Sequence, residues 1–585
     1  MITINKIRQL AKSVREYKLP VILTLILIVC EAIIETTIPF ITADLLNQIK
    51  EGAASDEILK TGLAMVGMAI VSLACGGIAG FTCAKASSGF SKNLRHDIYE
   101  KIQTYSFSNI DKFSSSSLVT RMTTDVVNVQ MSFMMLIRTA IRSPLMLIFS
   151  FTMAWRMGGA LAATFVIVIP ILVTGLLLIS KYAMPAFHAV FRKYDRLNES
   201  IEENVRGARV VKSFAREDHE KSKFGEKAEN IRKDFTKAEK IVAWNSPLMQ
   251  FCMYFNMAFI LILGSKMAIS DFGKTIDVGQ ISAMLTYGMQ ILMSLMMLSS
   301  IYVMLTMSAE SAKRICEVLN ENSSLQNPKE PVMEVADGSV EFDHVNFKYS
   351  ETAQKNALSG IHLTIRSGMT VGVIGGTGSG KSTLVQLIPR LYDATEGSVK
   401  VGGVDVRQYD MDVLRSSVAM VLQKNLLFSG TIKENLRWGN ENATDEEIVE
   451  ACKLAQADEF VRSFPDGYDT KIEQGGTNVS GGQKQRLCIA RALLKKPKIL
   501  ILDDSTSAVD TKTDAFIRNG FKTYIPETTK IIIAQRVASV QDADLILVMN
   551  NGSIEAMGTH SELLNSSSIY QEVYEQQTNG GDSDE

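Results

Sequence analysis

The chain has 585 residues, too many for a single domain, and its formal net charge of −2 gives no sign of a nucleic-acid partner. Hydrophobic residues make up 46% of the chain, and nearly all the long apolar runs lie before Ser308. Most of the charge outside the connecting segments lies after that point. This asymmetry predicts a membrane half followed by a soluble half. The seven cysteines show no metal-ligand or redox spacing and are interpreted as reduced.

The first 19 residues have the pattern of a helix that lies on a membrane surface. Ile4, Ile7 and Leu10 recur at roughly helical spacing among lysines and arginines. The apolar run that follows is too long for a signal peptide, contains two glutamates and has no small-residue cleavage site after it. We therefore interpret residues 1–19 as an interfacial helix and the following run as a membrane span.

Six stretches are apolar enough to cross a bilayer core, which needs about 20 residues of helix. They are residues 20–41, 62–84, 131–155, 159–180, 242–265 and 279–307. The gaps between spans two and three and between spans four and five are long, charged and helical in periodicity. The positive-inside rule places these gaps and the N-terminus in the cytoplasm. We expect an all-α transmembrane domain of six helices over residues 20–318, with long cytoplasmic helix extensions.

Four ionisable residues lie within the predicted spans, where charge is costly. They are Glu31, Glu35, Arg138 and Arg142. Either they line a route for substrate, or they lie near span ends and pair with one another for structure; the sequence does not decide between these alternatives. The sixth span is rich in methionine, which fits a promiscuous pocket or ordinary helix packing.

After a polar linker at residues 319–337, strands alternate with helices. Residues 369–374 read as a buried strand that runs into a glycine-rich loop and then an apolar helix, the setting of a phosphate-binding P-loop. Backbone N–H groups of such a loop and the helix N-terminus bind phosphates. We expect Lys381 to reach the β- and γ-phosphates and Ser382 to ligate Mg²⁺. The residues predicted to hold ATP here are Gly375, Gly376, Thr377, Gly378, Ser379, Gly380, Lys381, Ser382 and Thr383.

A second apolar strand, residues 499–502, ends in two aspartates. P-loop NTPases hold Mg²⁺ through an acid at the tip of such a strand, so Asp503 is expected to bind the ion. The cofactors implied by these two motifs are ATP and Mg²⁺.

The segment 478–486 resembles the signature motif of ATP-binding cassette (ABC) transporters. In that family the motif clamps the γ-phosphate of ATP bound to the opposite subunit, and a helix N-terminus aimed at an anion suits that role. The resemblance implies that four consecutive residues of this chain contact nucleotide. They are Ser480, Gly481, Gly482 and Gln483.

The resemblance extends over nearly the whole chain and implies further roles. Tyr349 matches the aromatic residue that stacks on adenine, Gln423 the glutamine that senses Mg²⁺ and the membrane half, and residues 507–510 the D-loop. Arg121–Asp125 and residues 198–217 resemble the intracellular segments that dock on ATP-binding domains. The family fold implies an α/β P-loop NTPase domain at residues 338–575, followed by an acidic tail, residues 576–585, that we expect to be disordered.

Two residues depart from the family pattern in the same ATP site. The family has a Glu that polarises the attacking water where this chain has Asp504, and a switch His where it has Gln535. A carboxylate withdrawn by about 1 Å can cost on the order of 10²-fold in rate, and Gln can neither carry charge nor relay a proton. The sequence predicts a catalytically degenerate site that binds ATP and hydrolyses it poorly.

The chain is therefore identified as an exporter-type half-transporter, similar to the degenerate-site subunit of heterodimeric bacterial multidrug exporters. We expect a non-identical partner chain that carries the Glu and the His, and multi-pass insertion in the cell membrane. The expected activity is ATP-driven export of a hydrophobic or amphipathic small molecule by alternating access. A slow homodimeric exporter of lipid or peptide and an ATP-gated channel or sensor remain alternatives, and the sequence does not identify the cargo.

Overall fold

The protein is described by a computed structural model that covers residues 4–270, 276–351, 353–504 and 510–579. Its contacts divide the chain into two units. The helical unit contains the residues up to Thr104 together with Ser114–Glu321, and the α/β unit contains Tyr105–Phe113 and the residues from Asn322 onward. A short segment between two long helices thus belongs to the unit formed by the second half of the chain.

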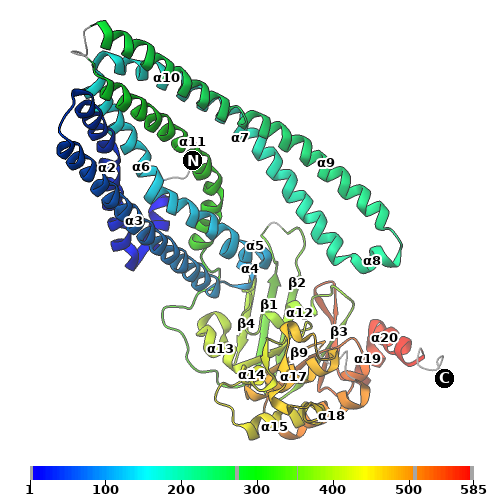
Figure 1. The fold of residues 1–585 in the computed structure, drawn as a ribbon. Helices are drawn as coiled ribbons and strands as arrows, with labels where there is room; N and C mark the ends of the chain where they lie inside the picture. Colours follow the sequence, from blue (N-terminus) through cyan, green and yellow to red (C-terminus); the bar gives the residue numbers. More distant parts are fainter. Residues whose placement is uncertain (1–3, 271–275, 352, 505–509, 580–585) are drawn as a thin grey trace. The chain divides into compact units, whose positions relative to one another are not determined.

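The helical unit is built from helices alone among the residues described. They are α1 (Ile4–Ala11), η1 (Lys12–Tyr17), α2 (Lys18–Glu51), α3 (Ser55–Gln103), α5 (Ser115–Thr120), η2 (Arg121–Asp125), α6 (Val126–Gly158), η3 (Gly159–Ala162), α7 (Ala163–Arg206), α8 (Ala208–Ser213), α9 (Glu217–Val242), α10 (Asn245–Ser270) and α11 (Val278–Asn320). Figure 1 shows α2, α3, α6 and α11 packed side by side. The helices α7 and α9 pair with each other, and α7 and α10 also contact α11.

Within the described residues, five continuous helical segments are long and apolar enough to cross a membrane. They are Lys6–Glu51, Ser55–Gln103, Ser115–Phe187, Glu217–Ser270 and Val278–Asn320. Each stretch predicted from hydropathy lies within one of them, and the 73-residue segment contains both span three and span four. The chain turns between these two spans at Gly159, whose φ of +46° suits a residue without Cβ.

The membrane character of the helical unit also appears in its exposed side chains. Leu73, Phe81 and Ile262 are 76%, 80% and 68% exposed, although each is large and apolar. An all-round apolar surface of this kind is stable in lipid and not in water. The helix α3 has 49 residues and therefore extends well beyond the roughly 20 that the hydrocarbon core requires. The expected all-α membrane domain with long helix extensions is confirmed.

The N-terminal segment packs on the helical unit through its apolar face. Leu10 and Val14 are buried, and Asp97 of α3 accepts hydrogen bonds from Ser13 (2.6 Å) and Arg15 (2.5 Å). These contacts hold η1 against α3, and α1 packs on α11. Of the apolar residues predicted to face lipid, Leu10 is therefore covered by protein.

The α/β unit contains two main sheets. The antiparallel sheet has the order β2 (Leu358–Ile365), β1 (Val340–Phe347), β4 (Glu396–Val401), β5 (Val404–Asp405). The larger sheet has the order β12 (Ser553–Gly558), β11 (Leu545–Asn550), β3 (Thr370–Gly375), β10 (Thr529–Ile533), β9 (Ile499–Asp503), β6 (Val418–Val421). Its strands are parallel except for β12. The β7 (Gly430–Thr431) and β8 (Lys471–Ile472) strands form a separate pair.

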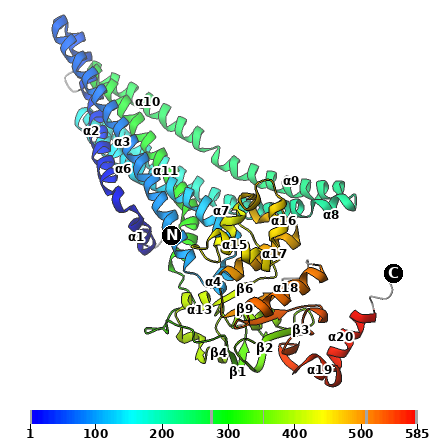
Figure 2. The same cartoon turned by 90° about the horizontal axis from the view of Figure 1, so that it is seen from below.

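Helices of the α/β unit lie around these sheets. They are α4 (Phe107–Phe113), α12 (Lys381–Gln386), η4 (Val406–Gln408), α13 (Met411–Ser417), α14 (Ile432–Arg437), α15 (Asp445–Leu454), α16 (Asp458–Ser463), η5 (Gly467–Asp469), η6 (Gln474–Gly476), α17 (Gly481–Leu494), α18 (Thr511–Tyr524), η7 (Val537–Ser539), α19 (His560–Ser566) and α20 (Ser568–Asn579). Figure 2 shows the six-stranded sheet between the antiparallel sheet and the helices α15–α17.

The six-stranded sheet is buried on both faces, as its continuous apolar strands predict. Successive side chains of a strand point to opposite faces. In β9, Ile499 and Ile501 belong to the core shared with the antiparallel sheet, whereas Leu500 and Leu502 belong to the core shared with α17. Two cores thus hold the tips of β3 and β9 rigidly, and those tips carry the predicted phosphate and metal ligands.

The C-terminal helix continues further than the sequence suggests. We expected residues 576–585 to be disordered, but α20 runs through Asn579. The Gln577 side chain donates to the Gln535 carbonyl at 2.8 Å and accepts from the Val537 N–H at 2.8 Å. Residues 576–579 are therefore ordered by contact with the strand end that carries Gln535, and residues 580–585 lie outside the described part.

Candidate nucleotide-binding site

The glycine-rich loop lies between β3 and α12, as the sequence predicts, and packing requires glycine at two of its positions. Gly375 has a φ of +155°, and a Cβ there would lie 2.2 Å from the carbonyl oxygen of Met549. Gly380 has a φ of +95°, and a Cβ there would lie 2.9 Å from the carbonyl oxygen of Ala357. Any side chain at either position would displace the loop from the neighbouring backbone, so the loop conformation depends on these glycines.

A cleft of about 630 Å³ opens beside this loop. It is lined by Tyr349, Lys355, Asn356, Ala357, Gly378, Ser379, Gly380, Lys381, Ser382, Thr383, Asn551 and Gly552. Most of the predicted phosphate-binding residues thus face one cavity, together with the predicted adenine-stacking residue.

Lys381 is held at the loop by backbone oxygens. Its Nζ donates to the carbonyls of Gly375 and Gly376, each at 2.8 Å. Burial lowers the pKa of Lys381, and the nearby Asp503 and Asp504 carboxylates oppose that shift. The Ser379 hydroxyl is a third, longer acceptor at 3.5 Å. An ammonium group whose acceptors are neutral gains when an anionic phosphate arrives, because hydrogen bonds between two charged groups are stronger.

Ser382 and Asp503 form a pair of oxygen ligands at the tips of α12 and β9. The Ser382 hydroxyl donates to Asp503 Oδ1 at 3.0 Å, and Asp503 is 4% exposed. Burial raises the pKa of Asp503, and Asp504 adds to that shift, whereas Ser382 and Lys381 oppose it. Hard oxygen donors at this spacing fit Mg²⁺, which prefers a carboxylate and hydroxyl alongside substrate phosphates. A bound cation would also offset the cost of burying the carboxylate.

The structure brings the three predicted catalytic residues together. Gln535 Nε2 donates to Asp504 Oδ2 at 2.7 Å, and Gln423 Nε2 lies 3.4 Å from the same oxygen. The N–H of Asp504 donates to the Ile533 carbonyl at 3.0 Å, and its φ of +49° is unusual for a residue other than glycine. Two side-chain amides and one backbone bond therefore hold this carboxylate against β10.

Tyr349 lies at the rim of the cleft. Its hydroxyl bonds to Thr383 Oγ1 at 2.9 Å, and its ring packs edge-on against Phe347 and Tyr392 with centroids 4.9 and 5.3 Å away. The residue is 50% exposed, so one side of the ring is accessible. An accessible aromatic face fixed by two rings can stack on a planar base.

The signature segment begins α17 in the manner that its sequence predicts. Ser480 caps the helix: its side chain accepts from the Gln483 N–H, and the Gln483 side chain accepts from the Ser480 N–H at 2.9 Å. Ser480 and Gly481 are exposed. The first two residues of this helix, Gly481 and Gly482, have no side chains that could cover its N-terminus. An anion can therefore approach the N–H groups there. Of the predicted D-loop, residues 507–509 lie outside the described part, and Asp510 caps α18.

The charged residues of the membrane spans pair with one another. Arg142 donates to both oxygens of Glu35 at 2.7 and 2.6 Å and lies 3.7 Å from Glu31. The Glu35 carbonyl also accepts from Gln290 Nε2 at 3.3 Å, which adds α11 to this network. Structural pairing, one of the two alternatives posed by the sequence, therefore accounts for three of the four residues.

One of the two segments that resemble docking segments makes its contacts inside the helical unit. Arg121–Asp125 forms η2, where the fully buried Asp125 accepts from Arg314 Nε at 2.8 Å and from Ser311 Oγ at 2.8 Å. These bonds join η2 to α11. A docking role for this segment and for residues 198–217 stays a prediction.

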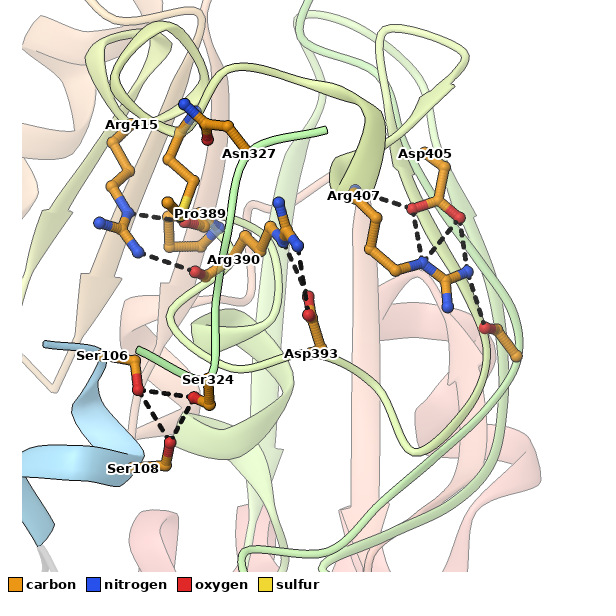
Figure 3. Close-up of polar contacts among 12 residues, drawn as sticks. Ser106, Ser108, Ser324, Asn327, Pro389, Arg390, Asp393, Asp405, Arg407 and Arg415 are labelled. Carbon is orange, nitrogen blue, oxygen red and sulfur yellow. Dashed lines mark hydrogen bonds and ion pairs between the residues drawn. The ribbon is translucent and has the colours of Figure 1, made fainter. Parts of the chain in front are cut away.

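The helix α4 is the element that joins the α/β unit. Asp111 accepts from the Tyr392 hydroxyl at 2.9 Å, and the ring of Phe107 lies 6.1 Å from the Tyr392 ring. Figure 3 shows the other end of this contact, where the hydroxyl of Ser324 bonds to those of Ser106 and Ser108 at 2.6 and 2.7 Å. The Tyr392 ring also contacts the ring of Tyr349, which lines the cleft. Two aromatic side chains, Tyr392 and Tyr349, therefore connect α4 with the cleft.

Figure 3 also shows three arginines that bond within the α/β unit. Arg390, 5% exposed, binds Asp393 at 2.8 Å, and Arg415 donates to the Arg390 carbonyl at 3.0 Å. Arg407 forms a separate pair with Asp405 at 2.6 Å. The bonds of Arg390 and Arg415 fix the segment that follows α12, the helix that begins at the phosphate-binding residues.

Comparisons with known proteins agree with this architecture. Residues 21–295 match the ABC transporter transmembrane region, and residues 358–507 match the ABC transporter family. The chain is 36% identical over 566 residues to "Uncharacterized ABC transporter ATP-binding protein YfiB" of Bacillus subtilis, covering 96% of this chain and 97% of that protein. The chain is therefore of the class in which a membrane domain is fused to an ATP-binding cassette. The chain belongs to the ABC transporter family.

Two further relatives refine the picture. The "Fatty acid ABC transporter ATP-binding/permease protein" of Mycobacterium tuberculosis is 33% identical over 480 residues, covering 82% of this chain and 75% of that protein. The "Structure of a bacterial Atm1-family ABC exporter with ATP bound" covers 96% of this chain and 99% of that chain, with a TM-score of 0.83 and 23% identity. The fold is that of an exporter half-transporter. The chain binds ATP and serves ATP-driven transport as a multi-pass membrane protein.

Proposed function

We propose that this chain is the degenerate-site subunit of a heterodimeric ABC exporter. The observation that carries the proposal is the Asp504–Gln535 hydrogen bond of 2.7 Å, which joins the two residues that depart from the family pattern. A partner chain with Glu and His at these positions would supply the competent site. This chain would bind ATP in its own cleft and complete the partner's site with its signature helix.

The geometry of Asp504 supports slow hydrolysis in this chain's own cleft. Asp is one methylene shorter than Glu, which withdraws the carboxylate by about 1 Å and can cost on the order of 10²-fold in rate. Oδ2 already accepts from Gln535, which holds the carboxylate toward that side chain and occupies one of its acceptor sites. The neutral amide of Gln535 also adds no positive charge where the γ-phosphate develops negative charge.

The residues that bind nucleotide, by contrast, are complete. Lys381 and the loop N–H groups would hold the phosphates, and Ser382 and Asp503 would hold Mg²⁺. Gln423 would complete the metal's surroundings and respond to its arrival, because its amide already lies 3.4 Å from Asp504. Tyr349 would stack on adenine through its accessible face. ATP bound here would act as a stable link between the two subunits.

The need for a second subunit is supported by exposed apolar residues in the helical unit. The helix α8 has no buried residue; Val210 within it and Phe214 directly after it are 60% and 73% exposed. It follows the 44-residue α7, too long to lie within a bilayer, so these side chains face water unless a protein covers them. A partner's ATP-binding domain is the cover that the exporter family offers.

The cargo that we propose is a hydrophobic or amphipathic molecule, of the kind that multidrug exporters carry. The membrane helices are mostly apolar, and Arg142, Glu35 and Glu31 pair with one another, so a strongly polar cargo finds few partners there. A relative whose name specifies fatty acid agrees with an amphipathic cargo. ATP binding would close the two cassettes and open the cavity outward, and hydrolysis in the partner's site would reset it by alternating access.

The test compares ATP hydrolysis by the purified full-length chain with that of Asp504→Glu combined with Gln535→His. We expect the unmodified chain to hydrolyse ATP at least about 10²-fold more slowly than the double variant, with similar nucleotide affinity. A Lys381→Ala version of each protein supplies the background. Brisk hydrolysis by the unmodified homodimer would contradict the proposal and favour a homodimeric exporter, and ATP-gated ion flux without cargo transport would favour a channel.

A further inference from the structure

A cluster of metal-ligating side chains lies on the antiparallel sheet, outside the nucleotide cleft. The chain has six histidines, and two of them, His344 in β1 and His362 in β2, have ring centroids only 5.0 Å apart. Asp343 lies between them: its Oδ1 is 2.7 Å from Nδ1 of His344 and 3.9 Å from Nδ1 of His362. One ligand atom from each residue lies within 4.8 Å of the other two.

A β-bulge creates this cluster. The register of β1 against β2 shifts between Phe342 and Val345, so that Asp343 and His344 together oppose His362. In a bulge, the extra residue bends the strand and re-aims its side chains. Without it, alternate residues of β1 would point to opposite faces, and Asp343 and His344 could not both lie beside His362.

The bulge is fixed by buried neighbours and by a glycine on the next strand. Phe342 and Val345 are 1% and 0% exposed, which anchors the bulge at both ends. A Cβ at Gly397, the second residue of β4, would lie 2.5 Å from the carbonyl oxygens of Asp343 and His344. His344 has a φ of +48°, a conformation that costs free energy and tends to occur at functional sites.

The spacing suits a single divalent ion. Zinc binds imidazole nitrogen and carboxylate oxygen at about 2.0–2.2 Å, which places ligand atoms roughly 3–3.5 Å from one another. The measured separations bracket that range, and small side-chain rotations would equalise them. The nearest cation, Lys400, is already bound to Glu341 at 3.0 Å, which partly offsets the charge that it would present to a metal ion.

A second histidine–carboxylate group in the helical unit provides a contrast. His96, Asp97 and Glu100 also have ligand atoms close together. However, Asp97 accepts hydrogen bonds from Arg15 and Ser13, so its charge is compensated and its oxygens are engaged. One histidine and one remaining glutamate are a poor ligand set, and this group serves as a control.

We propose that Asp343, His344 and His362 bind one zinc-class divalent ion, with water completing its coordination. Two imidazoles and one carboxylate on an open face match the ligand set that borderline metals such as Zn²⁺ and Co²⁺ prefer. The ion links β1 to β2 across the bulge and stabilises the antiparallel sheet. It is separate from the Mg²⁺ of the nucleotide cleft and does not depend on the proposed degenerate site.

The experiment titrates the full-length chain, purified in detergent without a histidine tag and stripped with EDTA, with Zn²⁺ against a fluorescent chelator. The variant combines His344→Asn with His362→Ala, because Asn tolerates positive φ at the bulge. We expect one Zn²⁺ per chain in the native protein and an affinity at least about 10-fold weaker in the variant. The control His96→Ala should bind as the native chain does.

A second readout separates ligation from general surface binding. Co²⁺ should give a visible d–d absorption band in the native chain that disappears in the double variant. Zn²⁺ should raise the thermal midpoint of the native chain alone, and Lys381→Ala should keep both signals. Absence of saturable zinc binding, or equal affinity in the native chain and the double variant, would overturn the proposal. Several weak sites insensitive to both substitutions would do the same.

Discussion

At the phosphate end of the nucleotide cleft, Lys381, Ser382 and Asp503 have the identities and the contacts that ATP and Mg²⁺ require. At the hydrolytic end, the next residue of the chain, Asp504, is shortened and bonded to a glutamine that replaces a histidine. Two adjacent residues at the end of β9 thus differ: Asp503 keeps the identity that Mg²⁺ binding requires, whereas Asp504 departs from the family's Glu. The difference teaches that binding and turnover rest on separate groups, so that one can be lost while the other is kept. The predictions below test that separation, ordered by expected size.

The largest effect is expected at the signature helix in the complex with the partner. Gly482→Asp places a negative charge where the partner's ATP would present its γ-phosphate, although an acid in the first turn favours the helix itself. Hydrolysis by the heterodimer should fall by at least about 10³-fold, comparable with or beyond the loss of an oxyanion-hole donor. ATP binding by this chain alone should not change. Asn442→Asp adds the same charge on an exposed loop and is the control; equal losses in both variants would contradict the trans role.

Removing the lysine of the loop should strongly weaken nucleotide binding at the intact end. Lys381→Ala deletes the side-chain ammonium that bonds to the loop carbonyls and leaves the phosphates without that cation. Truncating one member of such a charge pair costs about 2–5 kcal/mol, so nucleotide affinity should fall by about 100-fold. Binding of a fluorescent ATP analogue measures this, with the exposed Lys453→Ala on α15 as control. Unchanged affinity would refute the assignment of the cleft.

The paired charges of the membrane helices provide a comparison outside the ATP site. Arg142→Met leaves the Glu35 carboxylate without its cation, and removing one partner of a partly buried pair should cost roughly 2 kcal/mol. Arg142→Met combined with Glu35→Met should cost less than the single change. Thermal unfolding in detergent measures both, with the exposed Arg156→Met on the same helix as control. If the double variant were the less stable, the pair would have a role beyond structure.

The smallest effect concerns pH. Burial raises the pKa of Asp503, and the carboxylate must be ionised to bind Mg²⁺, so Mg²⁺-dependent ATP affinity should weaken at a higher pH than an ordinary Asp would predict. We expect the affinity to fall as the pH is lowered toward this raised pKa, since each unit of pH below the pKa lowers the ionised fraction tenfold. Affinity measured with EDTA in place of Mg²⁺, and in Asp503→Asn, should lack this dependence. A pH profile identical in all three would place the titrating group elsewhere.

Local patterns predicted much of this molecule. Hydropathy located the six membrane stretches, because a bilayer imposes a length and a composition on each helix independently of its neighbours. The loop from Gly375 to Thr383 was readable because glycine, lysine and serine occupy fixed positions within one strand–loop–helix unit. The capped start of α17 was equally local, since Ser480 and Gln483 bond to each other over three residues.

Contacts between distant residues could not be read in this way. The bond between Asp504 and Gln535 spans 31 residues and depends on the register of β9 against β10. The pairing of Arg142 with Glu35 spans 107 residues, and the sequence left its existence open. That α4 belongs to the α/β unit could not be read either, because α4 is short and its contacts with Tyr392 come from far along the chain.

The sequence by itself determined the class of protein, the membrane-spanning stretches and the identity of every residue that departs from the family. Only the tertiary structure decided that the altered carboxylate is bonded to the altered switch residue, that α4 joins the α/β unit, and that a bulge gathers two histidines around Asp343. The physical reason is that periodicity and motifs are properties of neighbouring residues. Hydrogen bonds across strands and helices depend on a register that packing alone selects.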